Sequence, residues 1–247
     1  MAGGPGGAFA GRFAALKTTC QLFAHDNEHF LGRGLCSERR EGVGLGEAWA
    51  AVTSYQSGAT ERRSYFRMPL GKELCADLCL RRAAEVCGAH GDNCDSYATG
   101  GMPPVPFAAA TSAVWVSCSG CRTPLHYDLC HGLLTQVEGS KRVLLAAPTD
   151  TRSLYPRGQH SGLNGNTSRV DLARWVADEA SQRRDFPNVC NADIYEVLLG
   201  PGDTLYTPPF WWHHVETLGG AASVSVLLAF DPTPAESTHP CVGDGWD

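Results

Sequence analysis

The second half of the chain alternates between short apolar runs and turn residues. Glycine and proline separate the runs, as at Glu138-Gly139-Ser140 and Gly200-Pro201-Gly202-Asp203. Many short strands between Gly/Pro turns are typical of a β-sandwich or β-barrel. The pattern therefore predicts a mainly β domain. Its predicted strands cover residues 113–118, 133–137, 143–147, 194–199, 204–206, 211–216 and 223–230.

Two segments have helical rather than alternating periodicity. Residues 70–88 carry apolar side chains near the helical period and end at Gly88 and Gly91. Residues 171–184 place Leu172, Trp175, Val176 and Ala180 on roughly one face, and Ser168 is the expected N-cap. We therefore expect a partly helical N-terminal lobe and one helix inserted among the strands.

Length and composition fit a folded domain with an additional lobe. The chain has 247 residues, 43% hydrophobic and 19% charged, which is enough to bury a full core. We divide it into an N-terminal tail and lobe, residues 1–95, and a main β domain, residues 96–247. A formal net charge of −6 argues against a protein that coats nucleic acid by bulk charge, and a local basic groove stays open.

The cysteines and the apolar runs bear on the cellular compartment. The 11 cysteines have no repeating spacing, and neither a secretory leader nor a run of membrane-spanning length is visible. We expect reduced cysteines and an intracellular protein, cytoplasmic or nuclear, with no membrane partner. Cys118 and Cys121 have CxxC spacing, for which redox or zinc chemistry is open, and a role as small buried hydrophobic residues is favoured.

Two distant segments carry candidate metal ligands. In a strand, His126 and Asp128 project from the same face. The adjacent His213 and His214 face opposite ways, so one of them can join a shared site. Two histidines and one carboxylate form a facial triad that leaves three positions open on octahedral iron. Those positions can take a bidentate 2-oxo acid and dioxygen.

The ordered motifs resemble a JmjC domain, and most of all the small hydroxylases of that family. The resemblance covers roughly residues 113–232. It is carried by Trp115, Thr123-Pro-Leu-His-Tyr-Asp128, Gln136-Val-Glu-Gly-Ser-Lys-Arg142, Leu154-Tyr-Pro156, Phe186-Pro-Asn188, Gly200-Pro-Gly-Asp203 and Trp211-Trp-His-His-Val215. It implies a double-stranded β-helix core of the jelly-roll or cupin type, Fe(II), and the cosubstrates 2-oxoglutarate and O2.

The resemblance also assigns roles to individual residues. It selects His213, with His126 and Asp128, as the metal triad, and it leaves His214 where relatives often carry Tyr. Three further positions match groups that contact the cosubstrate. Lys141 matches the lysine that pairs with the distal carboxylate of 2-oxoglutarate, and Thr123 matches a hydroxyl that assists the same carboxylate. Tyr65 matches a tyrosine of the N-terminal lobe that contacts the cosubstrate. The chain departs from some relatives at 225–228, where it has no asparagine.

The expected activity is hydroxylation of a C–H bond, with decarboxylation of 2-oxoglutarate to succinate. A polypeptide side chain is the favoured substrate. The alternatives are lysine N-demethylation and hydroxylation of a tRNA base. A cupin that binds a partner or a metal without catalysis, or a zinc-dependent cupin isomerase, is disfavoured by Lys141 and the Trp-His motif.

Overall fold

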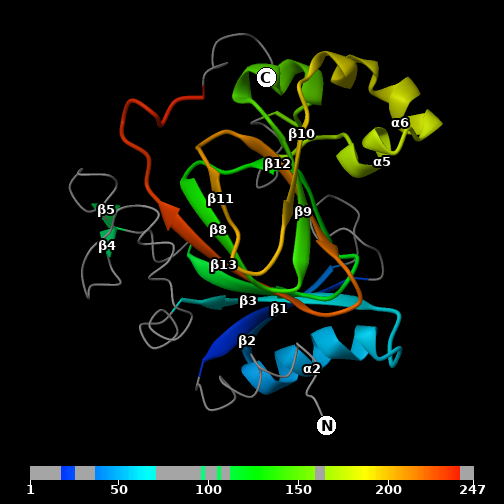
Figure 1. Ribbon diagram of the computed structural model, residues 1–247, viewed down its shortest axis with the longest axis vertical. Coiled ribbons are helices and arrows are strands. Elements are labelled where there is room, and N and C mark those ends of the chain that lie inside the picture. Colours follow the sequence, from blue (N-terminus) through cyan, green and yellow to red (C-terminus); the bar gives the residue numbers. More distant parts are fainter. Residues whose placement is uncertain are drawn as a thin grey trace.

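Two antiparallel sheets form the centre of the molecule. The computed structural model describes residues 18–25, 37–70, 112–158 and 165–239, together with the two-stranded pair β4 (Ser96–Tyr97) and β5 (Val105–Pro106). The helix predicted over 70–88 and the tail at 1–11 lie outside these residues. The larger sheet has seven strands in the order β11-β8-β13-β6-β3-β1-β2, and the smaller sheet has four in the order β10-β9-β12-β7 (Figure 1).

The strand bounds confirm the predicted mainly β class, because every predicted run falls on an observed strand. The large sheet contains β1 (Thr19–His25), β2 (Ser37–Gly44), β3 (Arg63–Pro69), β6 (Ala113–Ser117), β8 (His131–Glu138), β11 (Thr204–Thr207) and β13 (Ser223–Phe230). The small sheet contains β7 (Arg122–Tyr127), β9 (Ser140–Ala146), β10 (Tyr195–Leu199) and β12 (Trp212–Leu218). The two sheets face each other as in a cupin or jelly-roll core.

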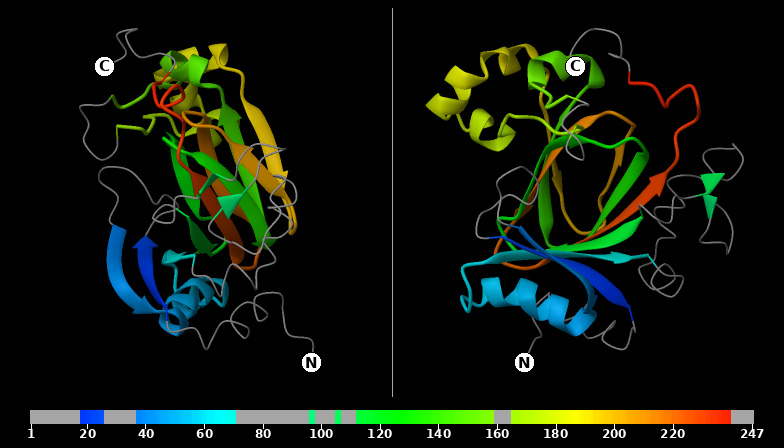
Figure 2. Two further views of the ribbon diagram at one scale, coloured as in Figure 1. Left: turned by 90° about the vertical axis from the view of Figure 1, so that its left-hand side faces the viewer. Right: turned by 180° about the vertical axis from the view of Figure 1, so that it is seen from behind.

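Each sheet has an inner face and an outer face because side chains alternate along a strand. Val143 and Leu145 of the small sheet pack with Leu134 and Leu205 of the large sheet, which identifies the inner faces. The outer face of the large sheet packs under α2 (Leu45–Gln56), whose Leu45, Ala48 and Val52 are buried. Figure 2 shows α2 and strands β1 and β2 at the opposite end of the molecule from α5 and α6.

The N-terminal lobe is joined to the main domain through the large sheet. Strand β3 pairs with β6, with Tyr65 opposite Ser117, and β1 pairs with β3. Periodicity predicts helix in this lobe and does not indicate its three strands, β1, β2 and β3. Their pairing continues the sheet beyond the barrel and brings Tyr65 onto the same inner face as Ser117.

The outer face of the small sheet is covered by the segment between β9 and β10. This segment contains η1 (Pro148–Leu154), α5 (Leu172–Val176), α6 (Ala180–Asp185) and η3 (Pro187–Asn191). The single inserted helix predicted over 171–184 is therefore wrong in detail. Asp178 has a positive φ of 61°, which a continuous right-handed helix does not allow, and the chain breaks there into two short helices.

The predicted N-cap is also corrected. The Asp171 side chain accepts the hydrogen bond from the Arg174 backbone N–H at 3.2 Å, so Asp171 is the cap of α5. Ser168 instead donates its hydroxyl to the Leu154 carbonyl and accepts from the Val170 N–H. It closes a turn that precedes the helix.

Replacing the cap residue should lower stability modestly. We expect Asp171→Ala to reduce the free energy of unfolding by about 1 kcal/mol, because one N–H of the first helical turn loses its acceptor. Chemical denaturation measures the change. Asp193→Ala removes an exposed carboxylate outside any helix and serves as the matched control. Equal stability of the two variants would contradict the assignment of the cap.

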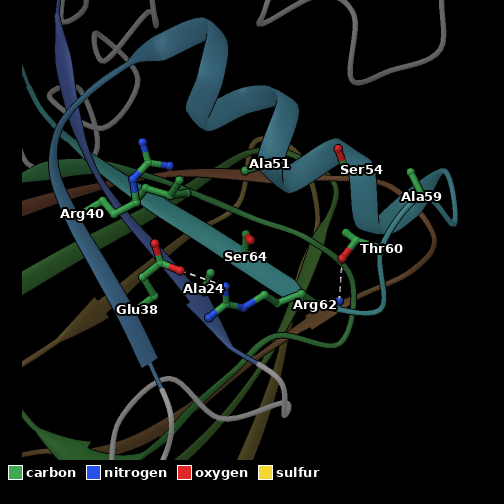
Figure 3. Close-up of a pocket in the computed structure, with 10 residues that line it drawn as sticks. Ala24, Glu38, Arg40, Ala51, Ser54, Ala59, Thr60, Arg62 and Ser64 are labelled. Atoms are coloured by element: carbon green, nitrogen blue, oxygen red, sulfur yellow. Dashed lines mark hydrogen bonds and ion pairs between the residues drawn. The ribbon is translucent and has the colours of Figure 1, made fainter.

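A pocket of about 320 Å³ lies on the outer side of the large sheet, between its edge strands and the end of α2 (Figure 3). Arg62 and Glu38, which form an ion pair at 2.8 Å, stand at its rim, and Ser64 lies on its floor. None of the three predicted metal ligands, His126, Asp128 and His213, lines it. Among the described residues, no helix has the length and apolar character needed to cross a membrane.

Candidate metal centre and cosubstrate pocket

Three predicted ligands come together at one end of the barrel. His126 lies in β7, Asp128 follows directly after it, and His213 lies in β12. One ligand atom from each residue lies within 4.8 Å of the others. The imidazole rings of the two histidines have centroids 4.1 Å apart, and Nε2 of His213 is 3.7 Å from Oδ2 of Asp128. Two imidazoles and one carboxylate in this arrangement match the donor set of a non-haem iron site.

Backbone carbonyls orient both imidazole rings. Nδ1 of His126 lies 2.8 Å from the Pro124 carbonyl, and Nδ1 of His213 lies 3.0 Å from the Trp211 carbonyl. A carbonyl can only accept, so each Nδ1 carries the proton and each Nε2 keeps a lone pair for a metal. Two effects lower the pKa of His213 to about 4: burial is the larger one, and the neighbouring His126 is the smaller. That histidine is therefore neutral at physiological pH, as a ligand must be.

The pairing register separates His213 from His214. His213 is opposite Leu145 of β9 and shares the inner face with it, whereas His214 is opposite Leu144. Leu144 belongs to the outer cluster that also contains Trp212. His214 is thus buried on the far side of the sheet, and only His213 reaches the other two candidate ligands.

An irregularity in β7 puts Thr123 on the same face as His126. Residues three apart in a regular strand face opposite ways. Here His213 pairs with His126, but Val215 pairs with Thr123, so β7 holds one extra residue between the two pairs. Such a β-bulge shifts the alternation by one residue. The predicted cosubstrate hydroxyl of Thr123 therefore faces the interior together with the metal-binding end.

Lys141 lies at the closed end of the same inner face. It is opposite Thr217 of β12 and Leu199 of β10, four residues along β9 from Leu145. The side chain is buried, with 6% of its surface exposed, so the alternative of a solvated turn lysine is wrong. Burial lowers its pKa to about 8. No hydrogen bond or ion pair joins its ammonium group to any part of the chain that the structure describes.

Tyr65 also reaches this end of the barrel. It stands on the inner face of the large sheet, buried, and its ring stacks on Phe23 at 4.5 Å and on Trp115 at 5.8 Å. Burial raises the pKa of its phenol, and Cys121 contributes to that rise. Cys121 also acts on the pKa of Lys141, so both groups lie within electrostatic range of one thiol. The contact of Tyr65 with cosubstrate stays a prediction.

The sequence analysis missed several polar groups on this inner face. Gln136 is fully buried in β8, and its Oε1 accepts a hydrogen bond of 2.8 Å from Ser225 of β13. β13 lacks the asparagine that some relatives carry there, and Gln136 of the neighbouring strand β8 supplies an amide beside it. Across the barrel, Ser117 and Thr217 share a hydrogen bond of 2.7 Å. Strand alternation from His213 along the same strand would have indicated that Thr217 faces inward as well.

Residues near the metal-binding end of the inner face are exposed, whereas the Lys141 end is buried. A row of paired residues crosses the small sheet at the metal end, namely Thr167, His126, His213, Leu145 and Tyr195. Tyr195 is 53% exposed, and Leu129, next to Asp128, is 63% exposed. Fold and site together define a cupin-type protein with a candidate site for one metal ion.

Comparison with known proteins identifies the family. The family model described as the Cupin-like domain matches residues 44–236, and this chain belongs to that family. The match includes the N-terminal strand β3 and helix α2 as well as the barrel. The family match covers most of the chain and confirms the predicted cupin-type core. The resemblance to JmjC-type oxygenases agrees with it and is supported by relatives that carry a JmjC domain.

Curated relatives agree with this membership. The chain is 44% identical over 111 residues to the Jumonji C domain-containing protein 5 of Drosophila melanogaster, across 45% of this chain and 26% of that protein. It is 33% identical over 115 residues to the lysine-specific demethylase 8 of Xenopus tropicalis, across 47% and 24%. It is also 33% identical over 127 residues to the tRNA wybutosine-synthesizing protein 5 of Danio rerio, across 51% and 35%. The matches thus span about a quarter to a third of each relative.

Proposed function

We propose that this protein is an Fe(II)- and 2-oxoglutarate-dependent oxygenase that hydroxylates a C–H bond on a protein side chain. In this proposal His126, Asp128 and His213 hold the iron, and Lys141 with Thr123 holds the far carboxylate of 2-oxoglutarate. Bound iron supplies the oxidising chemistry by activating O2 as 2-oxoglutarate is decarboxylated to succinate. The chain's own residues position both reactants and exclude water from the closed end.

The observation that carries the proposal is the buried lysine at a fixed distance from the triad. The row of Lys141 and Thr217 lies four residues along the strands from the row of Leu145 and His213, roughly 13 Å at a strand rise of ~3.3 Å per residue. A metal ion, a five-carbon dicarboxylate and the lysine side chain together fill such a span. A buried ammonium without a carboxylate partner is unfavourable, and the distal carboxylate would compensate it.

The residues fit the cosubstrate chemically as well as sterically. Thr123 offers a neutral hydroxyl beside the expected carboxylate, and Ser117 with Thr217 offers two more at the lysine end. Hydroxyl groups can donate to a carboxylate without adding charge. This selects a dicarboxylic 2-oxo acid over a 2-oxo acid that has an apolar tail.

The substrate class is the finer part of the proposal. Relatives include one named as a lysine-specific demethylase and one named for tRNA wybutosine synthesis, so N-demethylation and tRNA-base hydroxylation are the competing activities. We favour a polypeptide because exposed Leu129 and Tyr195 present apolar surface beside the triad, and the net charge is −6. The intracellular location inferred from the cysteines also remains a prediction.

One assay tests the proposal. The protein loaded with Fe(II) is incubated aerobically with 2-oxoglutarate, and succinate is quantified, first alone and then with peptide or tRNA mixtures. Peptides that gain the mass of one oxygen atom support hydroxylation, loss of a methyl group indicates demethylation, and gain of oxygen on a tRNA nucleoside indicates the RNA activity. Absence of iron-dependent succinate under all conditions would refute the oxygenase, and a cupin-type binding function would take its place.

A further inference from the structure

Cys118 and Cys121 lie against each other at the turn that links the two sheets. Their sulfur atoms are 3.3 Å apart, and the two side chains are 0% and 2% exposed. The turn is tight because the Cys121 N–H bonds to the Cys118 carbonyl at 3.4 Å and Gly120 has a φ of +73°. A disulfide requires a sulfur separation of about 2.05 Å. Closing this gap requires a movement of little more than 1 Å by two side chains that already face each other.

The two thiols have unequal chemistry. The pKa of the Cys118 thiol is lowered, mainly by its hydrogen bond with Cys121 and to a smaller extent by the nearby Arg63 guanidinium. Burial and the neighbouring Cys118 raise the pKa of Cys121. A Cβ atom placed on Gly120 would lie 3.2 Å from Nε of Arg63, which confirms that this cation stands over the turn. The opposite directions of the two pKa shifts favour Cys118 as the nucleophilic sulfur and Cys121 as its proton-bearing partner.

The two cysteines lie next to a residue that lines the outer pocket. The carbonyl of Ser64 accepts from the Cys118 N–H at 3.2 Å and lies 3.7 Å from the Cys121 sulfur. The same Ser64 lies on the floor of the outer pocket (Figure 3). Ser64 is thus the residue between the pocket and the buried sulfurs, and burial of both thiols favours a small oxidant over a bulky disulfide.

The turn is also bonded to the cosubstrate end of the barrel. The Thr217 N–H donates to the Cys121 carbonyl at 2.8 Å, and the Gly120 N–H donates to the Thr217 carbonyl at 3.0 Å. Thr217 is the residue opposite Lys141 in the sheet. A movement of Cys121 is thus transmitted through these hydrogen bonds to β12, which pairs with the strand of Lys141. It is also transmitted along the chain to Thr123, two residues later.

We propose that Cys118 and Cys121 form an oxidisable dithiol whose disulfide weakens binding of the 2-oxo diacid at Lys141. The oxidant is a hydroperoxide such as hydrogen peroxide. The Cys118 thiolate attacks one peroxide oxygen, which gives a sulfenic acid and releases water after protonation. The Cys121 thiolate then attacks the Cys118 sulfur and displaces hydroxide, which takes up the Cys121 proton. Two thiols and one peroxide give one disulfide and two waters.

The site and its effect are tested separately, because the effect rests on the proposed function and the disulfide does not. Reduced, iron-free protein is treated with hydrogen peroxide, its remaining thiols are alkylated, and cleavage after Trp115 and Arg122 isolates peptide 116–122. We expect this peptide to be unalkylated and two hydrogen atoms lighter than the peptide with two free thiols. Dithiothreitol should restore both thiols. Recovery of the doubly alkylated peptide while the exposed Cys190 is oxidised would overturn the site.

The second arm measures 2-oxoglutarate binding in the presence of Mn(II). Oxidation should weaken binding by about tenfold, the scale of one impaired hydrogen bond to a charged group, and dithiothreitol should reverse the change. Cys118→Ser and Cys118→Ala should not respond to peroxide, and Cys190→Ser should respond like the unmodified protein. A mapped disulfide without any change in binding would overturn the link to Lys141. Reduced protein that binds no 2-oxoglutarate would refute the proposed function and leave the peptide result valid.

Discussion

His213→Ala is expected to lower the affinity for Fe(II) or Mn(II) by about 100-fold or more and to abolish iron-dependent formation of succinate. The variant removes the only inner-face imidazole of β12, which leaves two of the three ligands of the facial triad. Loss of groups that merely orient a ligand already costs about 10- to 100-fold in metal affinity. Titration of the metal-free protein with Mn(II) and quantification of succinate provide two independent readouts.

The neighbouring histidine is a matched control. His214→Ala removes an equally large side chain one residue away, on the outer face beside Leu144. We expect it to lower stability by about 2 to 3 kcal/mol through the cavity it leaves, and to leave metal affinity unchanged. If His214→Ala lost the metal and His213→Ala retained it, the assignment of the triad would have to be reversed.

The sequence was sufficient for the features that depend on periodicity. Strand alternation alone placed His126 and Asp128 together and required that His213 and His214 separate. The structure agrees, although β7 ends at Tyr127 and Asp128 follows it. Alternation could not decide between the two histidines, because either could face inward. Only the resemblance to a family, or the pairing of His213 with Leu145, decides that question.

Features that depend on tertiary pairing could not be predicted from periodicity, although the family resemblance did single out Thr123. Thr123 stands three residues before His126, and regular alternation would have turned it outward. Its inward position depends on one extra residue in β7 relative to β12. The segment 171–184 has a helical apolar pattern, but Asp178 adopts a left-handed backbone conformation that the pattern does not reveal. The strands of the N-terminal lobe depend on pairing with β6, which is distant in the sequence.

Lys141→Met is expected to raise the KM for 2-oxoglutarate by about 100-fold or more. The side chains have similar length and shape, so the variant removes the charge and keeps the packing. Breaking one partner of a buried charge pair costs about 3 to 5 kcal/mol, which corresponds to a factor of 100 or more in binding. Steady-state succinate formation against 2-oxoglutarate concentration gives the KM. Arg142→Met is the control, because Arg142 lies on the outer face with Glu196 and Glu216.

The same lysine makes the stability of the cosubstrate-free protein depend on pH. Its pKa is about 8 in the fold, against 10.5 when unperturbed, so between these values the unfolded chain binds more protons. The free energy of unfolding should therefore rise from about pH 8 to 10.5, by at most about 3 kcal/mol from this group. The free energy of unfolding of Lys141→Met, measured by chemical denaturation across this pH range, should lack that rise. Saturating 2-oxoglutarate should also remove it from the unmodified protein, because the bound carboxylate keeps the ammonium charged. If Lys141→Met kept both the pH dependence and the original KM, the anion would have to be held elsewhere on the inner face.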